Sequence, residues 1–180
     1  IGVGVALSLL VVIYRSAYPH MAVLGRLPGT NSFRNLKRFR EAENRKDVLV
    51  VRFDAQMYFA NSSFFRDKVN TLVAEKGHDL RLVVVNAESM TFMDSTAVHT
   101  LHDMVKELKE KQITLYLASV IGPVRDILVR SHLMDELGKG SQFLHVHQAI
   151  EYWDQHGVHG ILGKQEPNVP AYQTNVVTAQ

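Results

Sequence analysis

The chain has 180 residues, with 20 Lys and Arg against 18 Asp and Glu, and hydrophobic residues make up 46% of it. This length supports one hydrophobic core, and the composition is that of a globular protein, which excludes wholesale disorder. The absence of cysteine excludes a disulfide scaffold, a thiol nucleophile and a thiolate zinc site. A formal net charge of +2 is too small to predict nucleic-acid binding.

The chain begins with an apolar run, residues 1–14, that contains no charged side chain. As a helix this run would be about 21 Å long, against about 30 Å for the hydrocarbon core of a bilayer. Arg15 comes after the run, whereas a secretory signal places its positive charge before the apolar segment. We therefore expect residues 1–18 to be the last part of a transmembrane helix with its basic flank. The alternative is a buried N-terminal helix of a soluble protein.

Basic residues dominate residues 15–46, where eight Lys or Arg stand against two Glu. An excess of positive charge just after an apolar span is typical of the cytoplasmic side of a membrane. We expect anionic lipid headgroups to contact this segment between Arg15 and Arg40. The alternative is a solvated basic linker, and both interpretations place the following residues in the cytoplasm.

Predicted strands and helices alternate along the rest of the chain. Strands are predicted at 21–24, 48–53, 82–85, 113–118 and 143–146, and helices at 62–75, 95–111, 123–137 and 147–156. This alternation predicts an α/β fold, with a mostly parallel central sheet of four to five strands flanked by helices. After Gly157 glycine and proline recur without any period, so we expect residues 157–180 to form a flexible or weakly packed tail.

The run YFAN joins the predicted strand at 48–53 to the helix that follows it. Tyr58 and Phe59 are predicted to bury apolar surface. Asn61 or Ser62 is predicted to cap the helix, because both side chains carry an oxygen that accepts from free backbone N–H groups.

Three short oxygen-bearing side chains, Asp94, Ser95 and Thr96, follow the buried strand and its polar turn. They predict a helix start, and two hypotheses for it stay open. In the first, Asp94 or Ser95 only caps the helix. In the second, Ser95 or Thr96 is a regulatory hydroxyl, since a phosphate there would add nearly two negative charges at a helix N-terminus and alter a partner surface.

The run FMDSTA, with VVVN before it and an amphipathic helix after it, resembles the signature of the STAS domain. This domain is shared by bacterial anti-sigma factor antagonists and the cytoplasmic tails of SulP sulfate permeases. The antagonists have Asp-Ser-Ser-Gly in this place, and the resemblance puts their phosphorylated residue at Thr96. Ala97 stands where the antagonists have glycine.

Two further segments resemble SulP proteins. PHMAVLGRLPGTNSFRN is similar to the junction between the last membrane helix and the STAS domain, and YFAN is similar to an element between an early strand and the first helix. The resemblance implies a STAS domain at 19–156 with an antiparallel early edge strand. It also favours the permease branch of the family over the antagonist branch.

The implied function is that of a cytoplasmic regulatory and interaction domain of a SulP-type secondary transporter of sulfate, bicarbonate or a dicarboxylate. The implied contact surface comprises Asp94, Ser95, Thr96, Ala97 and Val98. Its expected partners are the membrane domain of the same transporter, a second subunit of a homodimer, or a cytosolic protein. The alternative is a free-standing phosphorylation switch like the antagonists.

The chain offers no recognisable catalytic or metal-binding motif. His99 and His102, like His145 and His147, could share a face, but no metal-ligand spacing such as HExxH is present, and we expect no metal. No Gly-x-Ser-x-Gly elbow or phosphate-binding loop is present either, so we expect neither an enzyme nor a cofactor. Nucleotide binding beside Ser95 is permitted only by the STAS resemblance.

Overall fold

The computed structural model describes residues 2–138 and 140–157. Its strands are β1 (Met21–Arg26), β2 (Phe33–Asn35), β3 (Val48–Phe53), β4 (Leu82–Asn86), β5 (Thr114–Ala118) and β6 (Gln142–Phe143). Its helices are α1 (Gly2–Ala17), α2 (Ser62–Lys76), α3 (Ser95–Glu110), α4 (Gly122–Arg130), α5 (Leu133–Leu137) and α6 (Val146–His156), with a 3₁₀ turn at Gly77–Asp79. Apart from Gly157, the predicted tail lies outside the described residues.

The strands form one mixed sheet in the order β2-β1-β3-β4-β5-β6. Strands β3 to β6 are parallel, and β1 runs antiparallel to both of its neighbours. The α/β fold with a mostly parallel sheet is therefore confirmed. One detail of the prediction is wrong, because the described residues form six strands and not four or five. An early antiparallel strand does lie at the edge, as the STAS resemblance implies, but it is β2 and not the predicted strand at 21–24. The edge strand β2 has only three residues with a single apolar side chain, which is too short for a periodic signal.

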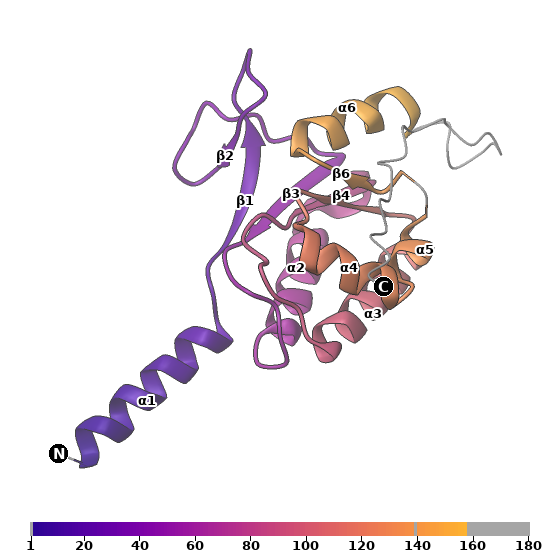
Figure 1. Cartoon of the computed structure of the whole chain (residues 1–180). Helices are drawn as coiled ribbons and strands as arrows, with labels where there is room; N and C mark the ends of the chain where they lie inside the picture. Colours follow the sequence, from indigo (N-terminus) through magenta and orange to yellow (C-terminus); the bar gives the residue numbers. More distant parts are fainter. Residues whose placement is uncertain (1, 139, 158–180) are drawn as a thin grey trace.

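Helices cover both faces of the sheet (Figure 1). Helices α2, α3, α4 and α5 pack on one face, and α6 covers the other. Every residue of β4 is buried because successive side chains face opposite helical layers: Val83 belongs to the larger core under α2 and α3, and Val84 to the core under α6. The continuous apolar run seen in the sequence is the consequence of this two-sided burial.

The predicted helix at 123–137 is interrupted, which corrects the sequence analysis. Helix α4 ends at Arg130 and α5 begins at Leu133, with His132 between them at a φ of 60°. His102 of α3 lies at the break, with Nε2 3.1 Å from the Ser131 carbonyl oxygen and Nδ1 2.9 Å from a Glu136 carboxylate oxygen. This contact is tertiary, so the helical period of the segment does not reveal it.

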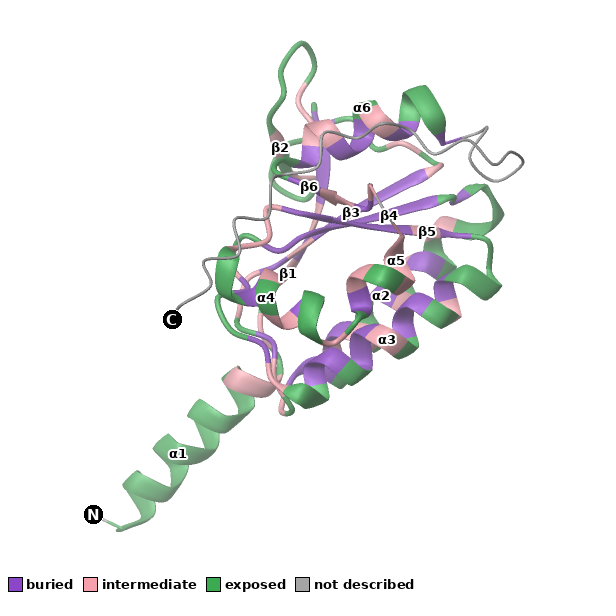
Figure 2. Ribbon diagram, turned by 45° about the vertical axis from the view of Figure 1, so that its right-hand side comes forward, coloured by how far each residue is buried: buried purple, intermediate pink, exposed green. Residues whose placement is uncertain are grey.

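Helix α1 extends away from the sheet and contributes no buried side chain (Figure 1). Its apolar residues are exposed, and it is green along nearly its whole length in Figure 2. The alternative of a buried N-terminal helix is therefore wrong. Among the described residues, no helix combines the length and the apolar character needed to cross a bilayer.

The segment after β2 crosses β1 at Gly25 with no room for a side chain. A Cβ atom added to Gly25 would lie 2.5 Å from the backbone oxygen of Glu43 and 2.5 Å from Cδ2 of Leu36. The Glu43 N–H also donates to the Arg26 carbonyl at 2.8 Å, which fixes the crossing point. Glycine is therefore required here because neighbouring atoms approach its Cα closely. Backbone conformation is not the reason, since Gly25 is not among the glycines with positive φ.

We expect Gly25→Ala to lower the free energy of unfolding by about 1–3 kcal/mol, because the new methyl group overlaps backbone that has no free direction to move. Urea unfolding followed by circular dichroism measures the loss. Gly122→Ala is the matched control, since a Cβ there meets nothing within 4 Å. Equal unfolding midpoints for Gly25→Ala and Gly122→Ala would contradict the prediction.

Candidate functional site: the start of helix α3 and the loops beside it

Asp94 caps α3 in the way the sequence predicts. Its backbone is extended, and its Oδ1 accepts a hydrogen bond from the Ala97 N–H at 2.8 Å. The carbonyl oxygen of Asp94 also accepts from the Val98 N–H at 3.0 Å. The capping hypothesis is thus confirmed for Asp94, whose side chain satisfies one of the free donors of the first turn and whose carbonyl accepts the first regular helical bond.

The second carboxylate oxygen of Asp94 binds a different loop. Its Oδ2 accepts from the backbone N–H of Phe59 at 2.9 Å, which joins the loop before α2 to the loop before α3. These loops run side by side: Met57 and Met93 form an isolated parallel bridge, and the Met57 N–H donates to the Phe92 carbonyl at 3.0 Å. The two loops therefore form one structural unit at the end of β3 and β4.

Asn61 attaches this unit to helix α1. Its side chain is 1% exposed, accepts from the Tyr58 N–H at 3.0 Å, and donates to the carbonyl oxygens of Gln56 and Ser16 at 3.0 and 3.3 Å. Ser16 lies in the last turn of α1. The same end of α1 is held by an edge-to-face contact between the rings of Tyr18 and Phe64, whose centroids are 5.4 Å apart.

The predictions for the YFAN run need correction. Asn61 occupies the N-cap position of α2 but makes no side-chain cap bond, and the buried hydroxyl of Ser62 has no partner among the described residues. Asn61 instead uses its polar atoms on its own loop and on α1. Phe59 was expected to be buried, but it is 71% exposed, because its backbone is held at Asp94 while its ring points to solvent.

The predicted contact surface is only partly at the surface. Ser95 and Thr96 are exposed, and within the described part of the chain their hydroxyls make no hydrogen bond. Ala97 and Val98 are 0% and 9% exposed and belong to the core, so their inclusion in that surface is wrong. The reason is helical geometry, since residues 97 and 98 open the apolar stripe that continues at Leu101.

The predicted histidine pairs serve other contacts. His102 contacts the α4–α5 break, and the rings of His145 and His147 stack with centroids 5.4 Å apart. Within residues 2–138 and 140–157, no group of three or more His, Cys, Asp or Glu side chains is placed to hold a metal ion.

Sequence reasoning missed an ionic cluster that fastens α6 to the sheet. Arg45 donates to both carboxylate oxygens of Asp47, at 3.0 and 2.6 Å, and to Asp154 of α6 at 2.7 and 2.9 Å. Asp154 is 109 residues from Arg45, so no sequence spacing marks the pair. The donation from Arg45 holds the pKa of Asp47 below its ordinary value of 3.8.

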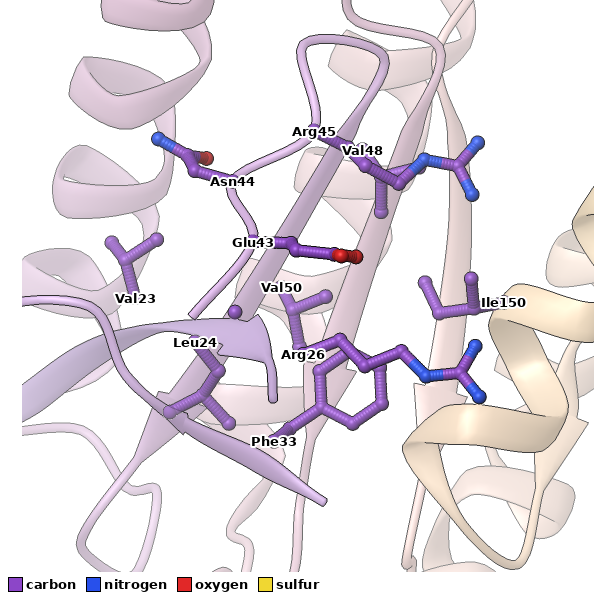
Figure 3. Close-up of a pocket in the computed structure, with 11 residues that line it drawn as sticks. Val23, Leu24, Arg26, Phe33, Glu43, Asn44, Arg45, Val48, Val50 and Ile150 are labelled. Atoms are coloured by element: carbon purple, nitrogen blue, oxygen red, sulfur yellow. The ribbon is translucent and has the colours of Figure 1, made fainter. Parts of the chain in front are cut away.

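A small pocket of about 80 Å³ lies beside this cluster, between β1, β3 and α6 (Figure 3). Its floor is apolar, with Leu24, Val50 and Ile150 among its lining residues. Two of the charged side chains at its rim are engaged elsewhere. The guanidinium of Arg26 donates to Thr30 and Asn31, and that of Arg45 donates to Asp154. We therefore assign this pocket to the packing of α6 and not to a site.

A second ionic cluster stands where α1 joins the domain. Burial opposes ionisation of Asp54, but hydrogen bonds from Arg52 and His20 outweigh burial and lower its pKa from 3.8. The contacts are short, 2.5 Å from Arg52 Nε and 2.7 Å from His20 Nδ1. Asp54 thus holds the segment between α1 and β1 against the end of β3.

We expect Asp94→Ala to lower the free energy of unfolding by about 1–2 kcal/mol, because it removes a helix cap and leaves the Phe59 N–H without an acceptor. Hydrogen exchange should become faster at the amides of both Phe59 and Ala97. Asp94→Asn keeps an oxygen that can accept one of these bonds, so its loss should be smaller. Unchanged exchange at Phe59 in Asp94→Ala would show that the two loops are held together without this carboxylate.

We expect acid to weaken the contribution of the Arg45 cluster to the free energy of unfolding. A carboxyl with a lowered folded-state pKa stabilises fully above its ordinary value of 3.8, and this stabilisation is lost as the pH falls through the lowered pKa. The stability difference between wild type and Asp47→Asn should therefore shrink from about pH 6 to about pH 3 in urea unfolding. Arg45→Gln removes the same contact from the other side, so the stability difference between wild type and Arg45→Gln should shrink over the same pH range. A gap that stays constant over this range would refute the assignment.

The chain is similar to known proteins in sequence and fold. A family model described as the STAS domain matches residues 39–151. The probable sulfate transporter 4.2 of Arabidopsis thaliana is 37% identical over 158 residues, which cover 83% of this chain and 23% of that protein. The chain thus spans about a quarter of the length of the curated relatives it matches.

Two solved structures have the same fold at low identity. The murine anion transporter Slc26a9 in its inward-facing state covers 86% of this chain and 25% of its own, with 22% identity and a TM-score of 0.77. The SulP transporter STAS domain of Vibrio cholerae covers 67% of this chain and 91% of its own, with 13% identity and a TM-score of 0.53. With the family match over 39–151, these likenesses lead to one conclusion: the chain belongs to the STAS domain family.

Proposed function

We propose that this chain is the STAS domain of a SulP-type anion transporter, together with the end of the membrane helix that precedes the domain. The observation that carries the proposal is α1, an apolar helix that has no buried residue and is attached directly to a STAS domain. The relatives named as sulfate transporters support sulfate as the transported anion, with bicarbonate or a dicarboxylate as alternatives. The membrane-spanning part of the transporter would contain the transport site.

In this proposal the domain lies on the cytoplasmic side of a cell membrane. The excess of Lys and Arg that follows α1 supports this orientation. Arg15 in the last turn of α1 would contact anionic headgroups, and the exposed basic residues through Arg40 would add to the attraction. Arg26 contributes less, because Thr30 and Asn31 already engage its guanidinium.

The domain would regulate transport through contacts at the start of α3. Ser95 and Thr96 are exposed there, and Asp94 connects this helix start to α1 through Phe59 and the buried Asn61. A partner that binds the helix start differently in two states of the transporter would shift the population toward one of them. That partner would be the membrane domain, a second subunit of a homodimer, or a cytosolic protein.

Phosphorylation at Ser95 or Thr96 would act on the same contacts that join Asp94 to α1 through Phe59 and Asn61. A phosphate there would lie beside the Asp94 carboxylate, which already occupies the Ala97 and Phe59 amides. Repulsion between the two anions would weaken the Asp94–Phe59 contact and so loosen the loop that binds α1.

The free-standing phosphorylation switch is less well supported. The exposed apolar α1 would be costly in a protein without a membrane partner, since exposed apolar area is normally buried by a partner or a bilayer. Nucleotide binding beside Ser95 is a separate hypothesis, and titration with labelled GTP against Asp94→Ala tests it.

We expect Thr96→Glu to change anion uptake, because it places a negative charge beside the Asp94 carboxylate. A coupling free energy of about 1 kcal/mol or more corresponds to roughly a fivefold change in uptake or in partner affinity. The measurement is uptake of labelled sulfate by the full-length protein in proteoliposomes, with circular dichroism to verify folding. Thr71→Glu adds the same charge at an exposed position on α2 and should leave uptake unchanged. Wild-type uptake and partner binding in Thr96→Glu would overturn the regulatory role.

A further inference from the structure

We propose that a pocket between β1 and α2, here called the β1–α2 pocket, binds a small soluble organic anion that carries an apolar body. The pocket has a volume of about 560 Å³. This volume lies within the range of about 300–1,000 Å³ that is typical of small-molecule sites. The inference goes beyond the proposed function and does not require a particular transported anion.

The β1–α2 pocket exists because one face of β1 is only partly covered. Ala22 and Leu24, on the face toward α6, are 2% and 5% exposed, whereas Met21 and Val23, on the opposite face, are half-buried. Helix α2 packs against the neighbouring strand β3. The face of β1 that lies on the same side as α2 is therefore left as a partly open apolar surface.

Apolar side chains line the inner part of the β1–α2 pocket. Besides Met21 and Val23, they are Leu36, Leu49 and Leu72. Leu49 is 1% exposed, and Leu36 and Leu72 are half-buried. An apolar group bound there would be removed from water, which the hydrophobic effect favours.

Two exposed lysines enter the lining from different elements. Lys68 lies on α2, and Lys37 follows β2. The Leu36 N–H donates to the Val23 carbonyl at 3.0 Å, which places Lys37 beside the first half of β1. Among the described residues, neither ammonium group forms an ion pair. Two such groups favour an anionic group between them.

Helix α2 sets the order of the groups along the β1–α2 pocket. Lys68, Leu72 and Lys76 follow one another at intervals of four residues, so they lie on one face of α2. At 1.5 Å per residue, Lys68 and Lys76 are about 12 Å apart along the helix axis. An apolar side chain thus separates two cationic ends.

The end at Lys76 is less suited to an anion. Lys76 Nζ already donates to Asn44 Oδ1 at 2.6 Å and to the Arg45 carbonyl. Glu75, a carboxylate that also lines the pocket, is next to it in the chain. We therefore place the anionic group of the ligand at the other end, with the two exposed lysines, and its apolar body along the half-buried leucines.

The position of the β1–α2 pocket favours a soluble ligand over a bilayer lipid. In the proposed function α1 lies in the membrane, and Met21 comes four residues after Ala17, the last residue of α1. The acyl chains of a bilayer lipid stay in the hydrocarbon region and would not reach the apolar lining. An apolar lining with two lysines fits an anion that brings its own apolar body, such as an alkyl or aryl phosphate.

Photolabelling of the full-length protein in proteoliposomes tests the proposal. The probe is octyl phosphate with a diazirine in its alkyl chain, and the matched probe is the corresponding octanol, which has the same body without the charge. Octyl phosphate should label peptides from residues 21–26 and 62–76 at least about tenfold more than octanol, since both lysines attract only the anion. Equal labelling by the two probes, or labelling confined to α1, would overturn the inference.

Substitutions in the pocket test each part of the assignment. Lys37→Glu combined with Lys68→Glu should reduce labelling by octyl phosphate at least about tenfold. Lys111→Glu combined with Arg130→Glu reverses two exposed charges outside the pocket and should leave labelling unchanged. Leu72→Trp fills the apolar part and should reduce labelling with both lysines in place. Circular dichroism verifies folding, and unchanged labelling in either folded pocket variant would overturn the inference.

Two further comparisons distinguish the sources of the anion. Unlabelled octyl phosphate should compete with the probe, whereas inorganic phosphate at the same concentration should not, because it has no apolar body. Phosphatidic acid with a diazirine in its acyl chain, placed in the bilayer, should not label residues 21–26 or 62–76. Labelling by phosphatidic acid in preference to octyl phosphate would assign the pocket to membrane lipid and overturn the soluble ligand. Equal competition by inorganic phosphate would overturn the role of the apolar lining.

Discussion

The carboxylate of Asp94 is shared between two segments, and the organisation of this end of the domain depends on the sharing. One oxygen holds the first turn of α3, and the other holds the backbone of Phe59, 35 residues earlier in the chain. A helix cap ordinarily serves only its own helix. Here the cap also fixes the loop before α2, and Asn61 in that loop reaches the last turn of α1. The start of α3 and the exposed apolar helix are thus connected by a short series of polar contacts.

These polar contacts differ in kind from the interactions that hold the sheet. The central strands bury apolar side chains on both faces, and such cores open only with the whole domain. The loops at 54–61 and 87–94 are mixed: Met57, Met90 and Met93 belong to the larger core, whereas the outer residues, Phe59 among them, are held by a few hydrogen bonds near the surface. These outer residues can rearrange at a smaller free-energy cost than the sheet.

Much of the architecture follows from local sequence pattern. The predictions that failed did so because they depend on tertiary contacts. The apolar run of β4 and the cap at Asp94 are readable because burial and capping depend on adjacent residues. Asn61 looks like a cap for the same local reason, but its side chain finds acceptors in Gln56 and Ser16 instead. The exposure of Phe59 likewise depends on the contact of its backbone with Asp94. The attachment of α6 depends on the ion pair between Arg45 and Asp154, which are 109 residues apart. No sequence period carries contacts of this separation.

The strength of the contacts between Asp94 and the Phe59 loop matches what the proposed regulation requires. A hydrogen bond in a protein contributes about 0.5–1.5 kcal/mol net, and one to a charged group about 1.5–3 kcal/mol. Coupling between sites in regulated proteins is typically about 1–3 kcal/mol. A single charge-assisted bond such as Asp94 to the Phe59 N–H therefore lies in the range that a phosphate or a docking partner can outweigh. A buried apolar contact in place of Asp94 would hold the loops more permanently and would give a charge at Ser95 or Thr96 nothing to act on.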